Sequence, residues 1–202
     1  GTQYTAGTSF SNLTSTNGGT ISRYAYSTPI TYQVKFNGNG STSGSMSNQS
    51  FTYDVAQNST ANAFKRAFTV TYNYNGNGMA NTSTTANATF NGWATSSTGS
   101  KVYDDKQSVK NLSSTQGAVV NIYAKWTDAS VILPTPTRTG YAFSGWYTST
   151  SGGTKIGAGG ASSTPSANIT LYAQWTPITY TVKYNGNGNT GGSTASSIHS
   201  YD

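Results

Sequence analysis

Bulky and polar residues alternate in three similar stretches of the chain, at residues 31–40, 69–78 and 179–188. The first reads Thr-Tyr-Gln-Val-Lys-Phe and the last Thr-Tyr-Thr-Val-Lys-Tyr, so that an apolar residue stands at every second position. This period is typical of a strand with one buried face. Each stretch ends in Asn-Gly-Asn-Gly, and both residue types tolerate the positive φ of tight hairpin turns. The pattern therefore predicts three strands, each followed by a turn.

Further strands are expected where the same alternation returns, at residues 50–53, 85–93, 118–126 and 168–175. Residues 55–64 form the best candidate for a short helix, with Asp54 as its N-cap. The sequence thus predicts a mainly β protein.

Two shorter phrases also recur, and they suggest an array of small modules. Residues 90–93 (Phe-Asn-Gly-Trp) match 143–146 (Phe-Ser-Gly-Trp), and residues 123–126 (Tyr-Ala-Lys-Trp) match 172–175 (Tyr-Ala-Gln-Trp). We divide the chain into a closing part of a preceding repeat (1–29), a long repeat (30–127), a short repeat (128–177) and an opening part of a further repeat (178–202). The long repeat carries an inserted strand-turn copy, and the short one lacks an opening strand. The partial copies suggest a segment of a longer protein.

These phrases together resemble the Listeria–Bacteroides repeat family, the internalin-type B repeat. The resemblance rests on the alternating strand with its Asn-Gly turn, on Arg-Thr-Gly-Tyr-Ala-Phe-Ser-Gly-Trp at 138–146 and on Leu-Tyr-Ala-Gln-Trp at 171–175. It implies small α+β, β-grasp-like modules, repeated in an elongated array along large secreted or wall-attached bacterial proteins.

The aromatic residues of the repeated phrases are predicted to form the module cores. A tryptophan buries about 200 Å², and a small module depends on such a contribution. The predicted core residues are Trp93, Trp126, Trp146, Trp175, Phe90, Phe143, Tyr123 and Tyr172. The alternative is that tryptophans stack on sugars. The remaining tyrosines are the better candidates for carbohydrate contact.

The titratable residues give little support to catalysis. Only 8% of residues are charged, and the five acids are all aspartates. The adjacent pair Asp104-Asp105 is the nearest approach to a calcium ligand set, and the lone His199 has no evident acid partner. There is no cysteine, no phosphate-binding loop and no apolar run of membrane-spanning length. We therefore expect no enzyme, metal or cofactor, and the dispersed charge of +6 argues against nucleic-acid binding.

The expected function is that of a structural repeat region in a secreted or cell-surface protein, as a stalk, spacer or adhesin body attached to the wall through another part. The alternative is a module that binds host or wall glycans through exposed tyrosines. Tyr180, Val182 and Tyr184 lie on one face of the last strand, which should add to a neighbouring sheet. That sheet is either residues 128–177 of the same chain, which we favour, or the start of another chain, which would give fibres.

Overall fold

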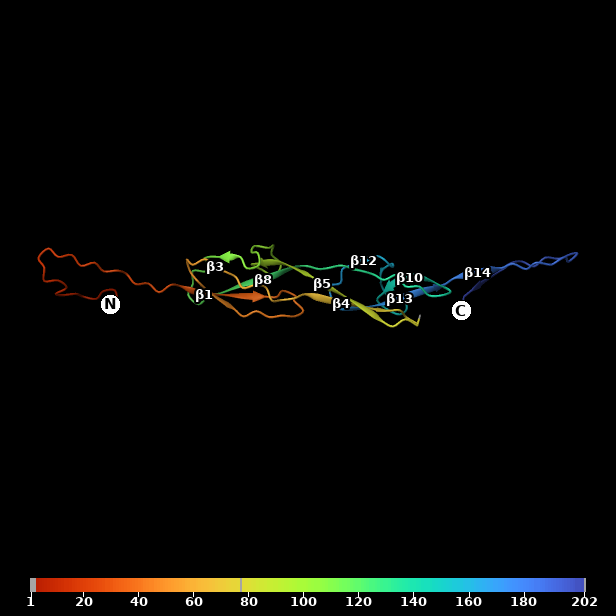
Figure 1. Cartoon of the computed structure of the whole chain (residues 1–202), viewed down its shortest axis with the longest axis horizontal. Coiled ribbons are helices and arrows are strands. Elements are labelled where there is room, and N and C mark those ends of the chain that lie inside the picture. The colour runs from red at the N-terminus through yellow and green to blue at the C-terminus, as the bar shows by residue number, and fades with distance from the viewer. Residues whose placement is uncertain (1–2, 77, 202) are drawn as a thin grey trace.

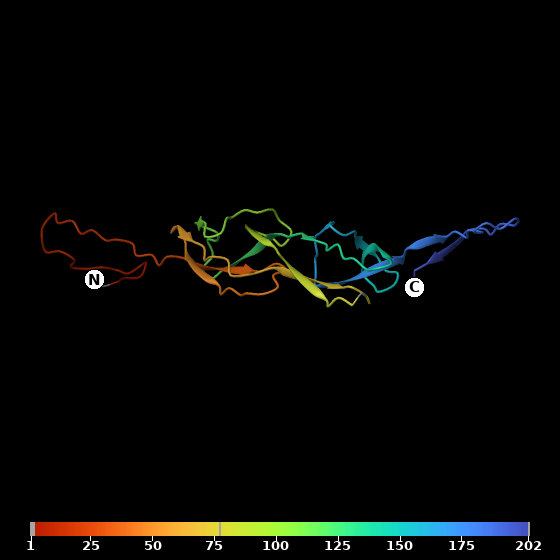
Figure 2. The same ribbon diagram turned by 45° about the vertical axis from the view of Figure 1, so that its right-hand side comes forward.

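The computed structural model shows a long, narrow molecule (Figure 1). It describes residues 3–76 and 78–201, so that Asn77 of the second predicted turn lies outside the described residues, as do Gly1, Thr2 and Asp202. Two β modules lie end to end along the axis. An irregular N-terminal segment, residues 3–30, extends from one end and a hairpin extends from the other (Figures 1 and 2).

The first module is a four-stranded sheet in the order β2-β1-β8-β6, with a two-stranded ribbon of β3 and β7 beside it. β1 pairs antiparallel with β2 and parallel with β8. The strands of this module are β1 (Thr31–Asn37), β2 (Gln49–Thr52), β3 (Gln57–Asn58), β6 (Thr89–Ala94), β7 (Ser108–Val109) and β8 (Val119–Thr127).

The second module is a five-stranded sheet in the order β11-β10-β13-β4-β5, with a ribbon of β9 and β12. β14 and β15 form the C-terminal hairpin. The remaining strands are β4 (Ala67–Asn73), β5 (Thr82–Asn87), β9 (Val131–Ile132), β10 (Tyr141–Tyr147), β11 (Lys155–Gly157), β12 (Ser162–Ser163), β13 (Ile169–Pro177), β14 (Thr179–Val182) and β15 (Ser197–Ser200).

The mainly β class is confirmed, whereas the helix predicted at residues 55–64 is wrong. The described residues contain no helix, and Gln57 instead pairs with Val109 between β3 and β7. Asp54 has a φ of 63° and its carboxylate accepts a hydrogen bond from Asn111 Nδ2 (2.8 Å). The side chain that was expected to cap a helix therefore joins two loops of the first module.

Each module has its own apolar core, built from alternate residues of its strands. In the first module Tyr32, Val34 and Phe36 of β1 pack on Trp93 and Ile122. The second core gathers the corresponding faces of β4, β13 and β10; its buried members are Val70, Tyr72, Tyr74, Ala86, Val131, Leu133, Trp146, Leu171 and Ala173. The period of two along each strand thus places one face inside.

The Phe-x-Gly-Trp phrase is a β-bulge in both modules. The pairing register shifts between Phe90 and Gly92 in β6 and between Phe143 and Gly145 in β10. Residues three apart would face opposite sides of a regular strand, but the extra residue of a bulge brings both onto the same face. The Phe90 and Trp93 rings consequently meet edge to face at 5.0 Å. Gly92 has a φ of 124°, and a Cβ there would lie 2.4 Å from the Tyr103 carbonyl oxygen, so the bulge requires glycine.

The opening strands of the two modules are β1 and β4, and both are followed by an Asn-Gly-Asn-Gly turn. Aligning the two strands by their structural positions gives a different register from aligning them by these turns. Asn39 Nδ2 donates to the Ala124 carbonyl (2.9 Å), and the equivalent bond to Ala173 comes from Asn75 (3.1 Å). Asn75 is the first asparagine of its turn, whereas Asn39 is the second. The structural register of β4 is therefore shifted by two residues from the one that the turn motif suggests. The shift is even, so the buried face is the same.

Candidate functional site

The inserted strand-turn copy of the long repeat belongs to the second module. β4 runs parallel to β13, with Val70 beside Ile169 and Tyr72 beside Leu171, and β5 forms the sheet edge. Residues 67–87 thus supply the opening strand that residues 128–177 lack. The structural modules therefore cross the boundary drawn at residue 127 from the sequence.

Three chain segments consequently connect the modules, and we call this region the joint. The chain leaves the first module before β4, returns between β5 and β6, and leaves again between β8 and β9. The first two connections touch, because the Ala88 amide donates to the Arg66 carbonyl (2.8 Å). Three covalent connections restrict relative rotation of the modules far more than one linker would.

Arg66 holds the joint through its guanidinium group. Nε and Nη2 donate to the two carboxylate oxygens of Asp128 at 2.7 and 3.1 Å, and Nη1 donates to the Gly40 carbonyl at 2.9 Å. Hydrogen bonding to Arg66 lowers the pKa of Asp128, and the same bond raises the pKa of Arg66. Both side chains are largely covered, which makes this two-point contact stronger than an ordinary surface ion pair. The contact ties both outgoing connections to the turn after β1.

The tryptophans of the repeated phrases lie in the cores in two different ways. Trp93 and Trp146 are fully buried at the module centres, whereas Trp126 and Trp175 are partly buried at the ends of their strands. Trp126 Nε1 donates to the Gly38 carbonyl (2.9 Å) and Trp175 Nε1 to that of Tyr74 (3.2 Å), fastening each closing strand to its opening turn. Phe90 and Phe143 pack beside them.

Tyr123 and Tyr172 are not core residues, so this part of the core prediction is wrong. Both are partly exposed, and neither belongs to a core cluster. The buried neighbours along the strands are Ile122 and Ala124 in β8 and, correspondingly, Leu171 and Ala173 in β13. Because alternate residues face opposite sides, the tyrosine between two buried residues points to the outer face. The burial of the flanking alanine could have been inferred from that alternation.

The aspartates of the described residues make structural contacts in separate places. Asp54 lies 3.3 Å from Lys110 Nζ and Asp104 lies 2.6 Å from Lys101 Nζ. Asp105 accepts a hydrogen bond from the Asn62 amide (2.8 Å). Across residues 3–76 and 78–201, no group of three or more His, Cys, Asp or Glu side chains could hold a metal ion. No helix in this part of the chain could cross a membrane.

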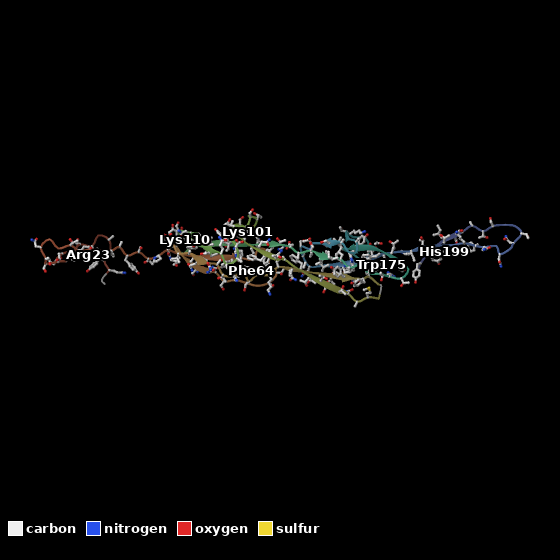
Figure 3. The ribbon with its side chains drawn as sticks, turned by 45° about the horizontal axis from the view of Figure 1, so that its top comes forward. Arg23, Phe64, Lys101, Lys110, Trp175 and His199 are labelled. Carbon is white, nitrogen blue, oxygen red and sulfur yellow. The ribbon has the colours of Figure 1, made fainter. Side chains whose placement is uncertain are left out.

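His199 lies on β15 within the C-terminal hairpin (Figure 3). Its Nε2 is 2.7 Å from Ser197 Oγ, and its ring stacks on Tyr180 with centroids 5.6 Å apart. Asp202, the nearest acid in the sequence, lies outside the described residues. The contacts of His199 are thus those of a side chain on a sheet face.

The exposed tyrosines gather in the two terminal segments. They are Tyr4, Tyr24, Tyr26, Tyr180, Tyr184 and Tyr201. The expected fold-back of residues 178–188 onto residues 128–177 is wrong, because β4 already occupies that position beside β13 and β14 pairs with β15. Tyr180 and Tyr184 therefore stay uncovered.

Taken together, the molecule consists of small β modules in tandem, each closed by an Asn-Gly turn, a Phe-x-Gly-Trp bulge and a Tyr-Ala-x-Trp strand. Residues 113–174 match the Listeria-Bacteroides repeat domain, so the chain carries a repeat of this family and the resemblance is confirmed. The matched segment begins before β8 in the first module and ends in β13 of the second, and it does not include β4. The matched segment therefore lacks both strands, β4 and β5, that residues 67–87 supply to the second sheet.

A curated relative supports the same assignment. Internalin H of Listeria monocytogenes serovar 1/2a is 32% identical over 126 residues, which cover 50% of this chain and 23% of the relative. The chain thus spans less than a quarter of that protein's length. No solved structure matches the chain. The family and the relative together support a repeat region of a surface-protein type.

Proposed function

We propose that this chain is a stalk or spacer of a secreted or cell-surface bacterial protein, with no catalytic activity. The observation that carries the proposal is the joint, where three chain segments and the Arg66–Asp128 contact connect modules that lie end to end (Figure 1). A rigid connection converts each added module into a fixed gain in reach. The Listeria-Bacteroides repeat and the internalin relative support a location at the cell surface. Attachment to the wall, through a part outside this sequence, belongs to the same proposal.

Glycan binding by exposed tyrosines receives less support. Tyr180 and Tyr184 correspond to Tyr32 and Phe36, which are core residues of the first module. Among the described residues no strand covers Tyr180 and Tyr184 as β8 covers Tyr32 and Phe36, so their exposure does not require a sugar. An adhesin body that presents a binding domain elsewhere needs only the reach of the array.

The distance between the far ends of the two modules tests the proposal. The chain has no cysteine, so Ser114→Cys and Ser151→Cys give two unique sites for spin labels at exposed positions. Ser114 lies near the start of β1, where Gln116 contacts Thr31, and Ser151 lies beyond the far end of β4, where Asn75 contacts Thr150. Pulsed dipolar spectroscopy should give one long, narrow distance distribution. A broad distribution would mean that the joint is flexible and would refute the rigid spacer.

A matched pair within one module provides the control. Labels at Ser114 and at Ser97, which is also exposed and contacts Asn39 near the joint, measure the width that the first module alone contributes. The distribution across the joint should be no more than slightly broader than this reference.

A further inference from the structure

The core of the first module contains a small cavity beside its buried tryptophan. The cavity has a volume of about 10 Å³, and its wall includes Val34 and Phe51 of the sheet, Val109 of β7, Trp93 and Ser59. A water molecule needs about 10–15 Å³ of such space. The cavity therefore has room for one water molecule and for nothing larger.

Two residues in this wall carry buried polar atoms that lack a partner in the chain. Trp93 is fully buried and Ser59 is 9% exposed. Neither Trp93 Nε1 nor Ser59 Oγ forms a hydrogen bond with any group of residues 3–76 and 78–201. A buried donor without an acceptor destabilises the folded state, so nearly all such groups in proteins are satisfied by the chain or by ordered water. The indole N–H and the hydroxyl therefore require a small polar partner.

The second module has the same site without the hydroxyl. Leu133 takes the place of Ser59, because each residue follows the first strand of its module's two-stranded ribbon. The Ser59 amide donates to the Gln107 carbonyl (3.0 Å), and the Leu133 amide donates in the same way to that of Ala161 (2.9 Å). Leu133 is 1% exposed and packs in the same core cluster as Trp146. An apolar side chain thus fills the position of the hydroxyl.

The buried indole of the second module is satisfied by the chain itself. Trp146 corresponds to Trp93 in the Phe-x-Gly-Trp bulge, and its Nε1 donates to the Pro134 carbonyl (2.8 Å). Thr60 holds the position of Pro134 in the first module, but its carbonyl does not accept the Trp93 N–H. The two modules therefore satisfy the same buried donor differently.

We propose that one water molecule binds in the cavity and bridges Trp93 Nε1 and Ser59 Oγ. The indole N–H donates to the water oxygen, and the water bonds in turn to the hydroxyl, which can donate or accept. Water fits because it combines the required size with both hydrogen-bonding roles, whereas a cation would face the indole N–H, which can only donate. The proposal concerns the interior of one module, so it goes beyond the spacer function and does not depend on it.

The bridging water holds the Trp93 indole less firmly than the Pro134 carbonyl holds that of Trp146. Immobilising a water molecule costs entropy, which offsets part of the hydrogen bonding that it provides. The first core thus depends on a solvent molecule for a contact that the second core makes within the chain.

A crystal structure of the unchanged chain, at a resolution that shows ordered waters, tests the proposal directly. One peak of electron density should lie within about 3.2 Å of both Trp93 Nε1 and Ser59 Oγ. Trp146 Nε1 is the internal control and should have no such peak, because it already donates to Pro134. A cavity without density, or a Ser59 rotamer that accepts directly from Trp93 Nε1, would overturn the proposal.

Ser59→Leu tests the same site in solution by introducing the residue of the second module. The larger side chain should fill the cavity and displace the water. The indole N–H signal of Trp93 should then move upfield in the NMR spectrum, because it loses its hydrogen bond, and its cross-relaxation with water should disappear. The signal of Trp146 should stay in place.

Ser114→Leu provides the matched control, because it makes the same change at an exposed position of the first module. Both indole signals should keep their native positions in this variant. If Ser59→Leu folds and the Trp93 signal keeps its position and its cross-relaxation with water, the bridging water is refuted. If Ser59→Leu fails to fold, the density in the unchanged chain still decides.

Discussion

The two modules reach the same arrangement of strands by different routes along the chain. The first reads β2-β1-β8-β6 and the second β5-β4-β13-β10-β11, so each opening hairpin lies beside the closing strand, followed by the bulged strand. In the first module the opening hairpin comes from the start of its own segment. In the second it comes from residues 67–87, which lie between two strands of its neighbour. The comparison shows that the strand order of a module is set by which apolar strand faces pack together. The order in which the chain connects those strands matters little.

The cores also fill one equivalent position differently. Gly38 and Tyr74 both accept the indole hydrogen bond of a closing tryptophan. Tyr74 fills the second core with its own ring, 5.5 Å from Trp146, whereas Phe64 from another segment lies near Trp93 at 6.3 Å in the first. Phe64 and Trp175 mark the two cores in Figure 3. In the second module the ring beside the buried tryptophan therefore comes from Tyr74, directly after the opening strand. In the first module it comes from Phe64, in a different segment.

Deletion of residues 67–87 should have the largest effect and should separate the modules. The cut ends are adjacent, because Ala88 donates to the Arg66 carbonyl (2.8 Å), so the first module can close. The second loses Val70, Tyr72 and Tyr74 from its core and should unfold. The measurement is the set of indole N–H signals in a two-dimensional NMR spectrum. Those of Trp93 and Trp126 should keep their positions, while those of Trp146 and Trp175 should move to random-coil values.

A deletion of residues 179–202 is the matched control for that experiment. It also removes a hairpin with an opening strand, but one outside both cores. All four indole signals should persist. Retention of the four signals after removal of residues 67–87 would show that the second module folds without β4.

Truncation of the buried tryptophans should give the next largest effect and should differ between the modules. Trp146→Ala and Trp93→Ala should each cost about 3–5 kcal/mol, the range for large aromatic side chains. Trp146 Nε1 donates to the Pro134 carbonyl (2.8 Å), whereas Trp93 Nε1 has no partner within the described residues. Loss of that bond should make Trp146→Ala the more costly change by about 1 kcal/mol. Urea titration followed by NMR of each module measures both values; a larger cost for Trp93→Ala would contradict the comparison.

The smallest predicted effect concerns the joint and its dependence on pH. The pKa of Asp128 is lowered in the folded protein, so the contact with Arg66 stabilises the fold above the unfolded value of about 3.9 and is lost as the pH falls through the lower folded value. Arg66 stays charged throughout. Asp128→Asn should reduce stability by about 1 kcal/mol at pH 7 and by nearly nothing at pH 2. Thermal melts at the two pH values measure this, and an equal loss at both would show that the charge is not the cause.

Much of the fold followed from local patterns in the sequence. The alternation at residues 31–36 and 179–182 predicted strands that the structure contains, and the recurring phrases predicted equivalent closing strands. Binary alternation is a strong signal because one face of each strand is buried. The helix at residues 55–64 failed because Asp54 bonds to Asn111 and Gln57 pairs with Val109, and such long-range partners leave no local pattern.

The joint could not be predicted in the same way. The sequence showed an extra opening strand in one repeat and a missing one in the next, which are the two facts that the structure connects. Pairing β4 with β13 requires contact between residues such as Thr69 and Asn168, which are 99 positions apart. The two-residue shift of β4 was equally hidden, because it leaves the buried face unchanged.

This interleaving also orders the events by which the chain can fold as it is synthesised. The strands β4 and β5 are made before the first module receives β8, and long before β13 exists. During that interval Val70, Tyr72 and Tyr74 have no closing half to pack against. The first module closes when residues such as Asn39 and Ala124, 85 positions apart, can meet, whereas the second must wait for nearly a hundred residues to follow its opening strand. Contacts of such high sequence separation form slowly, so the β4–β5 hairpin is the segment most exposed to mispairing in a newly made chain.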